Sequence, residues 1–259
     1  MVIGLVTMIH RQALVDYLAT ALQPERVVDY CPNGLQVEGR DTITRLVTGV
    51  TASARFIRQA IAANADAILV HHGYFWKGEA ASIVGYKAER IRLLLGHELN
   101  LLAYHLPLDT HAQWGNNACL GQKLGITPRP PVRVAGVDGL LWHGDLAAPV
   151  APQAFANQLA ECLGQAPLHV GDGPSSIEHV GWCSGGGQGF LSAAAALGVD
   201  AYFSGEISEP TTHEARELQV HYWAAGHHAT ERFGVQALGE HLAAKFALEH
   251  VFIDDPNPA

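Results

Sequence analysis

The sequence predicts a mixed α/β fold of two related lobes, residues 1–128 and 129–259, whose sheets are covered by helices. Segments with the apolar spacing of an amphipathic helix alternate with short apolar runs that are typical of buried strands. Such alternation favours a parallel or mixed sheet with helices on both faces. The order of elements restarts after a proline-rich connector at residues 127–132, which indicates an internal duplication.

The expected elements of the first lobe begin with a helix over Arg11–Leu22, where leucine and valine recur at helical spacing. Turn residues follow at 29–34, and then a short strand at 35–37. The remaining predicted elements are strands at 46–50, 67–70 and 99–104, helices at 53–63, 87–97 and 116–124, and an aromatic loop at 73–78.

The second lobe is expected to repeat this order. Its predicted helices lie at 152–163, 190–197, 209–218 and 233–246, and its strands at 168–170, 179–183, 201–203 and 220–225. The residues at 65–67 before His71-His72 correspond to those at 199–201 before Gly205-Glu206. A His-x-x-x-acid pattern also follows one strand in each lobe, so we expect a functional site between the two halves.

Composition favours metal or acid–base chemistry in a globular protein. Hydrophobic residues make up 48% and charged residues 16% of the 259 positions, which argues against a disordered chain. The net charge of −9 and the lack of a Lys/Arg block disfavour binding to duplex nucleic acid. Histidines number 15 against 16 Lys and Arg together, an imbalance that favours metal binding over electrostatic binding.

Cysteine usage and hydropathy predict a soluble protein in the reducing cytoplasm. The 4 cysteines are far apart and form no CxxC pair, so neither a zinc ribbon nor a disulfide scaffold is expected. Residues 1–9 are apolar but lack the basic region and cleavage site of a secretion signal. Other apolar stretches are interrupted before they reach membrane-spanning length.

Three clusters of histidine and carboxylate follow predicted strands and carry most of the functional information. In open α/β sheets, ligands bind beyond the carboxyl ends of the strands, so these side chains are expected to meet at one edge. Imidazole and carboxylate donors suit two divalent ions such as Zn, Fe, Mn, Co or Ni, whereas Cu(I) and iron–sulfur clusters need thiolate. The clusters are His71 with His72, His105 with Asp109, and His227 with Glu231.

The first and third clusters are expected to supply metal ligands. Adjacent residues within a strand point to opposite faces, so His71 and His72 are placed just past the strand end, where both rings can turn into one pocket. An isolated pair would more often be ordinary loop histidines, but the small Gly73 and the matching clusters favour ligation. His227 and Glu231 share a helix face, and the carboxylate can bridge two ions. A first-turn glutamate stabilised by the helix dipole is the alternative for Glu231.

Pro107 separates the members of the second cluster, so a loop is expected between them. Asp109 is a predicted ligand. His105 is a sixth ligand, a group that orients a carboxylate, or the acid–base residue, and it is our catalytic candidate. His111 and His228 are interpreted as ordinary structural histidines. The donors leave about three ligands per ion and an open position, which is typical of a catalytic site.

Two further motifs have two interpretations each. The segment Gly185–Gly189 follows a strand and precedes a helix, so it either binds a phosphate through its backbone amides or is a tight turn. The segment Tyr74–Lys77 either lines a substrate pocket, with Lys77 as an anion contact, or is a packed loop.

Five segments carry a family resemblance: Tyr30–Gly39, Val47–Ser53, His71–Gly78, His105–Asp109 and Ala225–Arg232. Together they resemble the Nif-three-like proteins, also called GTP cyclohydrolase I type 2 homologues, and in particular their bacterial YbgI-like branch. The resemblance extends from about Ile9 to the end of the chain. It implies two α/β lobes around a dinuclear metal centre, and a toroidal homohexamer built as a trimer of dimers. The implied ligands are His71, His72, Asp109, His227 and Glu231, with His105 adjacent.

The leading functional hypothesis is a metal-dependent hydrolase that uses a metal-activated water on an unidentified small molecule, either a nucleotide-like ring or a phosphoester. The alternative is a non-enzymatic metal protein that buffers, delivers or senses the ion. A titratable group beside the ions, for which His105 is the best candidate, favours the enzyme. A toroid that encircles nucleic acid is disfavoured by the acidic charge.

Overall fold

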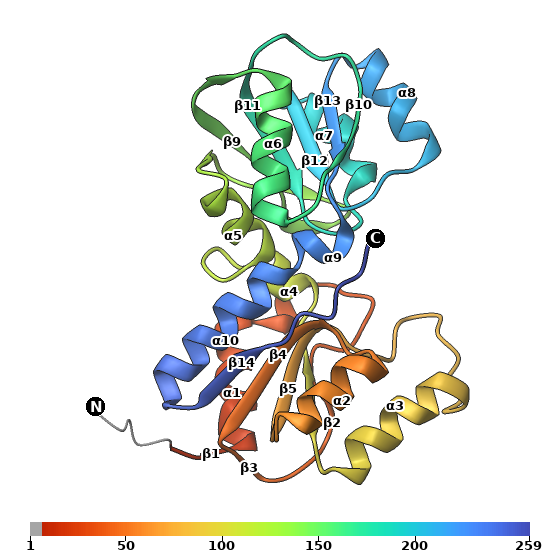
Figure 1. Cartoon of the computed structure of the whole chain (residues 1–259), viewed down its shortest axis with the longest axis vertical. Helices are drawn as coiled ribbons and strands as arrows, with labels where there is room; N and C mark the ends of the chain where they lie inside the picture. Colours follow the sequence, from red (N-terminus) through yellow and green to blue (C-terminus); the bar gives the residue numbers. More distant parts are fainter. Residues whose placement is uncertain (1–6) are drawn as a thin grey trace. The chain divides into compact units, whose positions relative to one another are not determined.

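Two sheets organise the chain, each at the centre of its own unit (Figure 1). The computed structural model describes residues 7–259. Most of residues 1–9, which were expected not to be a secretion signal, therefore lies outside the described residues. The first unit runs to Leu108 and includes Gly234–Asp255, and the second comprises Asp109–Phe233 and Pro256–Ala259. This division differs from the predicted lobes, because the C-terminal helix and strand pack into the first unit and residues 109–128 into the second.

The sheet of the first unit is mixed and mostly parallel. Strands β14, β4, β5 and β6 run parallel to one another, and β2 pairs antiparallel with β6 at one edge. A separate two-stranded ribbon pairs β1 with β3. In sheet order the strands are β14 (Glu249–Phe252), β4 (Arg45–Thr51), β5 (Ala67–His72), β6 (Asn100–Ala103) and β2 (Gly34–Val37), and the ribbon is β1 (Ile9–His10) with β3 (Thr42–Ile43).

Helices bury both faces of this sheet, as its nearly continuous apolar strands require. One face packs α2 and α3 through a core that includes Phe56, Ile68 and Leu94. On α2, the hydroxyl of Ser53 accepts a hydrogen bond from the backbone N–H of Phe56 and caps the helix. The helices are α1 (Arg11–Leu22), the 3₁₀ turn η1 (Pro24–Arg26), α2 (Ala54–Ala62), α3 (Gly85–Gly96), α4 (Leu106–Asp109) and α10 (Arg232–Phe246).

The sheet of the second unit also has a parallel centre, formed by β11, β12 and β13. Antiparallel β10 and β9 flank it, β7 pairs with the outer side of β9, and β8 also pairs with β9. In sheet order the strands are β10 (Leu168–Val170), β13 (His221–Ala224), β12 (Ala201–Ser204), β11 (Ile177–Cys183), β9 (Val137–Val150) and β7 (Thr127–Pro128), with β8 (Val132–Val134) off this path.

Large aromatic side chains fill the core of the second unit. Trp182 stacks on Phe203, and Phe155 from α6 contacts Phe203 and Trp223. Gly121 lets α5 approach Trp182, because a Cβ there would lie 2.6 Å from the indole. The helices of this unit are α5 (Asn116–Lys123), α6 (Pro152–Leu163), the 3₁₀ turn η2 (Gln188–Phe190), α7 (Leu191–Ala195), α8 (Glu209–Glu217) and α9 (His227–Thr230).

The predicted mixed α/β class is confirmed, and the helices at Arg11–Leu22 and Pro152–Leu163 have the predicted bounds. The long strand β9 was missed, because its glycines break the alternation of apolar residues that marks a strand. The loop predicted between His105 and Asp109 is wrong: α4 forms there, and Pro107 is tolerated because it lies in the first turn of the helix. The internal duplication stays a prediction.

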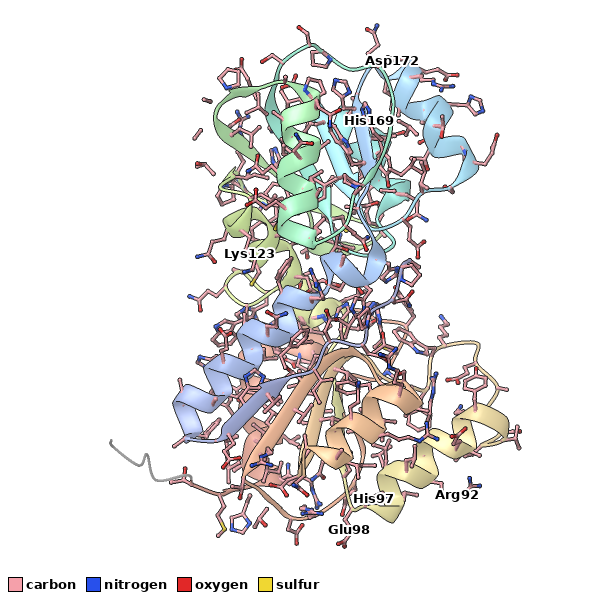
Figure 2. The ribbon with its side chains drawn as sticks, viewed as in Figure 1. Arg92, His97, Glu98, Lys123, His169 and Asp172 are labelled. Atoms are coloured by element: carbon pink, nitrogen blue, oxygen red, sulfur yellow. The ribbon has the colours of Figure 1, made fainter. Side chains whose placement is uncertain are left out.

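Exposed polar groups cover the outer surfaces of both units. His97 and Glu98 lie in the turn after α3, His169 lies in the edge strand β10, and Asp172 follows that strand (Figure 2). Among the helices formed by residues 7–259, none combines the length and the apolar character that crossing a membrane requires.

Candidate metal centre

Three histidines form a cluster in the first unit. One ring nitrogen from each of His71, His72 and His105 lies within 4.8 Å of the others. Nδ1 of His71 lies 3.0 Å from the carbonyl oxygen of Tyr104, and Nδ1 of His72 lies 3.2 Å from the hydroxyl of Thr51. Because these contacts engage Nδ1, they orient each ring so that Nε2 is the nitrogen suited to ligation.

The predicted position of the histidine pair is corrected by the structure, which places both residues inside β5 rather than beyond it. His71 is fully buried and His72 is half-buried, as their opposite directions along the strand require. Their ring centroids are nevertheless 4.7 Å apart. Strand β6 pairs with β5 only as far as Val70, so both rings extend past the end of the neighbouring strand and can converge there.

A buried carboxylate holds His105 in place. Oδ1 of Asp29 lies 2.9 Å from Nδ1 of His105, and Oδ2 accepts hydrogen bonds from the backbone N–H of Leu106 and the side chain of Asn33. Burial alone would raise the pKa of Asp29, but its hydrogen bond and charge interaction with His105, together with the other donors, lower that pKa to about 2. Asp29 is therefore ionised at neutral pH and fixes the orientation of the His105 ring.

Cys31 lies beside this pair but is not a thiolate. Its sulfur is within 4.8 Å of donor atoms of Asp29 and His105. Burial and the neighbouring Asp29 charge raise the pKa of the Cys31 thiol to about 12. In the metal-free protein Cys31 is therefore a thiol, although its sulfur, Asp29 and His105 together form a group that could hold a metal ion.

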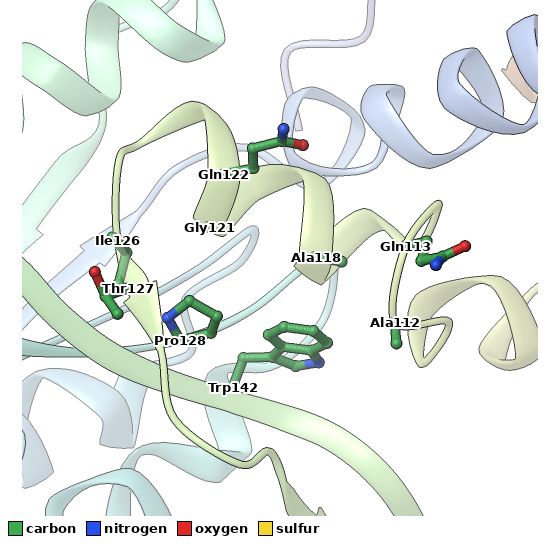
Figure 3. Close-up of a pocket in the computed structure, with 9 residues that line it drawn as sticks. All are labelled: Ala112, Gln113, Ala118, Gly121, Gln122, Ile126, Thr127, Pro128 and Trp142. Atoms are coloured by element: carbon green, nitrogen blue, oxygen red, sulfur yellow. The ribbon is translucent and has the colours of Figure 1, made fainter.

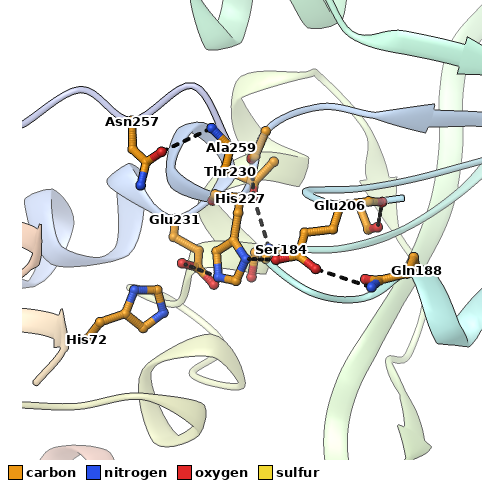
Figure 4. Close-up of polar contacts among 12 residues, drawn as sticks. His72, Ser184, Gln188, Glu206, His227, Thr230, Glu231, Asn257 and Ala259 are labelled. Atoms are coloured by element: carbon orange, nitrogen blue, oxygen red, sulfur yellow. Dashed lines mark hydrogen bonds and ion pairs between the residues drawn. The ribbon is translucent and has the colours of Figure 1, made fainter. Parts of the chain in front are cut away.

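The second unit assembles its own cluster around His227 (Figure 4). Nε2 of His227 lies 3.2 Å from Oε2 of Glu231, and its Nδ1 lies 2.7 Å from Oε1 of Glu206. Burial would lower the pKa of His227, but the hydrogen bonds and charges of Glu231 and Glu206 outweigh it and raise this pKa to about 9. In the metal-free protein the imidazole is thus cationic at neutral pH, and a metal ion would compete with that proton.

Two buried carboxylates lie close together in this unit. The exposed fractions of Asp109 and Glu231 are 4% and 2%, and an oxygen of each lies within 4.8 Å of the other. Asp109 accepts hydrogen bonds from Asn116 and from the Ser184 hydroxyl, at 2.9 and 3.0 Å. Like charges at this separation are costly when buried, and a divalent cation bound between the two carboxylates would stabilise both.

The glycine-rich segment after β11 is a tight turn that approaches this cluster closely. The amide of Gly185 donates to the Thr230 hydroxyl, and the amide of Gly187 donates to the carbonyl of Gly185. Both amides therefore already have acceptors within the protein, which favours the tight-turn interpretation over phosphate binding. Gly185 has φ +62°, and a Cβ there would lie 2.1 Å from Oε1 of Glu231.

Replacing Gly185 by alanine should therefore displace Glu231 and weaken metal binding. Alanine at positive φ costs about 1–3 kcal/mol of stability in any case. Gly198→Ala is the matched control, because Gly198 has φ +75° and no atom within 4 Å of its added Cβ. We expect both variants to lose stability in urea unfolding but only Gly185→Ala to lose metal affinity by isothermal titration. Equal affinity in the two variants would contradict the close approach.

A cavity of about 620 Å³ lies in the second unit between α5 and the strands β7 and β9, and no predicted ligand lines it (Figure 3). No titratable side chain lines it, so it offers no acid–base chemistry. Its lining residues are Ala112, Gln113, Ala118, Gly121, Gln122, Ile126, Thr127, Pro128 and Trp142.

The structure thus brings the predicted residues together as two sets, one in each unit. His71 and His72 meet His105, and Glu231 lies close to both Asp109 and His227. The convergence of all these donors on one dinuclear site stays a prediction. The exposed Lys77 is absent from the pocket lined by Tyr74 and Trp76, so its predicted role as an anion contact has no support there.

Sequence reasoning missed the residues that hold the donors in place. Asp29 was assigned only to a turn, and Glu206 entered only the comparison of the two halves. Ser184 and Asn116, which bond Asp109, carried no signal. Only Glu206 had a signal in the sequence. Its correspondence with the His71-His72 pair places it at the end of a strand, where the predicted ligands also lie.

The fold and these clusters define a mixed α/β protein with grouped imidazoles and carboxylates of the kind that can hold metal ions. Residues 9–258 match the family Duf34/NIF3 (NGG1p interacting factor 3), and the chain belongs to this family. The resemblance inferred from the motifs is therefore confirmed.

Its relatives match along nearly their whole length. A protein of Allochromatium vinosum named GTP cyclohydrolase 1 type 2 homolog is 54% identical, over 95% of this chain and 96% of its own. A Pseudomonas aeruginosa protein of the same name is 50% identical, over 95% and 97%. The solved structure of the protein ybgI, described as of unknown function, covers 97% of this chain and 100% of its own, with 46% identity and a TM-score of 0.93.

Proposed function

We propose that the protein binds two divalent metal ions per chain and acts as a metal-dependent hydrolase. The observation that carries the proposal is the pair of buried carboxylates, Asp109 and Glu231, whose oxygens lie within 4.8 Å of each other beside His227. Even with the cationic His227 beside Glu231, two buried carboxylates leave an excess of negative charge, which is destabilising. A bound cation gives this arrangement a physical reason.

The residues present fit such ions in their chemistry. Carboxylate and imidazole are ligands for Zn, Fe, Mn, Co and Ni. We assign His71, His72, Asp109, His227 and Glu231 as the ligands, with Glu231 as the bridge. When bound, divalent ions would supply Lewis acidity and a water of lowered pKa.

His105 and Asp29 are the proposed acid–base pair. Asp29 accepts a hydrogen bond from Nδ1–H of His105, so Nε2 of the same ring keeps a lone pair and can take a proton. The ring is positioned rigidly, because its backbone N–H also donates to the Asn33 side chain. This arrangement favours an enzyme over a protein that only stores or delivers metal.

The relatives' shared name, GTP cyclohydrolase 1 type 2 homolog, supports a nucleotide-like substrate. A phosphoester is the other substrate class within the proposal. Both undergo attack by water at an electrophilic centre, which is the reaction that a dinuclear divalent site promotes.

The proposal is tested by elemental analysis of metal-reconstituted protein, together with a screen of nucleotides and phosphoesters. We expect about two ions per chain, and His105→Ala should keep that content while turnover falls by about 10²–10⁴-fold. One ion or fewer at saturation would refute the dinuclear centre. Loss of metal from His105→Ala would make His105 a ligand, and metal binding without any turnover would favour storage or delivery.

We further propose a cytoplasmic homohexamer, a trimer of dimers, as the motif resemblance implies. Closed symmetric assemblies of this kind repeat the same contacts in every subunit. Sedimentation velocity at micromolar concentration should give the mass of six chains, and a monomer would contradict it.

A further inference from the structure

A small cavity in the first unit adjoins the histidine cluster and is rich in cationic and aromatic side chains. Its volume is about 130 Å³, enough for a group the size of a few water molecules. Gly73, which lines it, directly follows His72 in the chain. The ring of Trp76, which also lines it, lies 5.9 Å from the ring of His72 and 5.2 Å from that of His105.

Two cations from α3 face this cavity. Lys87 is only 6% exposed, and its ammonium donates to the carbonyl of Ala80 and lies 3.4 Å from Glu79. The guanidinium carbon of Arg90 lies 5.1 Å from the ring centroid of Tyr86 and 6.0 Å from that of Tyr74. Cation–π contacts with two aromatic rings therefore restrict the position of the guanidinium.

The charges at this cavity are not balanced. Glu79 is its one acidic lining residue; one carboxylate oxygen lies near Lys87, and the other accepts hydrogen bonds from the backbone N–H groups of Phe75 and Trp76. Within residues 7–259, Arg90 has no ion-pair partner, and its Nε is buried without a hydrogen-bond acceptor. A buried guanidinium N–H with no acceptor is costly, so an oxyanion in the cavity would be stabilising.

We propose that this cavity is a phosphate-binding subsite that anchors the phosphate group of the substrate beside the metal centre. The planar fork of Arg90 matches two phosphate oxygens, and Lys87 adds a second positive charge. The assignment of this phosphate to a substrate rests on the proposed function. The binding of phosphate to the cavity is independent of that function, because none of the residues that line the cavity is an assigned metal ligand.

The test is phosphate binding by metal-free protein, prepared with a chelator and measured by isothermal titration. We expect saturable binding to the wild type and a loss of affinity of about tenfold or more in Arg90→Gln. Arg92→Gln is the matched control: it makes the same change on the same helix, but Arg92 is exposed on the outer side of α3 (Figure 2). Its affinity should equal that of the wild type.

Absence of saturable binding to the wild type, or equal affinity in the two variants, would overturn the subsite. Should Arg90→Gln fail to fold by circular dichroism, Arg90→Lys takes its place, because it keeps the charge but loses the fork. A nucleoside monophosphate is titrated in parallel, and it should bind at least as tightly as inorganic phosphate. Binding of inorganic phosphate alone would overturn the assignment to a substrate. Metal content measured in the same variants tests the proposed function separately.

Discussion

Replacing Glu231 by glutamine should remove both metal ions from the protein. The change keeps the size of a side chain that is 2% exposed but deletes the charge placed next to Asp109 and His227. The variant therefore lacks the Glu231 carboxylate that is proposed to bridge the two ions. We expect affinity to fall by more than the roughly 10- to 100-fold that is typical when a group outside the ligand shell is mutated.

Metal content is measured by elemental analysis after dialysis against a range of free metal concentrations. Glu217→Gln is the control, because Glu217 is exposed on α8 and should leave binding unchanged. Loss of only one ion from Glu231→Gln would show that this carboxylate does not bridge. Retention of both ions would show that it is not a ligand at all.

The second large effect is expected from Asp29→Asn, which should lower the free energy of unfolding by about 2–4 kcal/mol at pH 7. The Asp29 side chain is 3% exposed and accepts hydrogen bonds from the His105 ring, the Asn33 side chain and backbone N–H groups. An asparagine has one acceptor oxygen, and its amide N–H₂ would face donors. Urea unfolding of metal-free protein measures the difference.

The effect should depend on pH with a definite sign. The pKa of Asp29 is lowered to about 2 in the folded protein, from its ordinary value of 3.8. Its stabilising contribution is therefore complete above about pH 4 and is lost as the pH falls towards 2. The difference between wild type and Asp29→Asn should narrow over that range and stay constant from pH 5 to 8.

Asp41→Asn is the control for this comparison. Asp41 forms an ion pair with Arg11, but its side chain is 83% exposed, and such surface pairs contribute about 0–1 kcal/mol. If Asp29→Asn were no more destabilising than Asp41→Asn, Asp29 would not be the group that holds His105 in place.

Local patterns along the chain were sufficient to predict the α/β class and most elements. Helical spacing of leucines identified α1 and α6 with their observed bounds, because an amphipathic helix repeats its signal every turn. Apolar runs likewise identified the central strands of both sheets. Strand β14 was missed, since two of its four residues, Glu249 and His250, are polar and none of the four is fully buried.

The candidate ligands were likewise readable from the sequence, because histidine and acidic residues following apolar strands form a compact pattern. Only the tertiary structure decided which groups support them. Asp29 reaches His105 from 76 positions away, and Ser184 reaches Asp109 from 75. Hydrogen bonds over such separations depend on how distant strands and loops pack, which spacing along the chain does not encode. The sequence by itself therefore determined which kinds of donor, imidazole and carboxylate, this protein offers. Packing of the folded chain determined which of its charged groups are buried, and burial is what makes Asp109, Glu231 and Arg90 candidates for ligand binding.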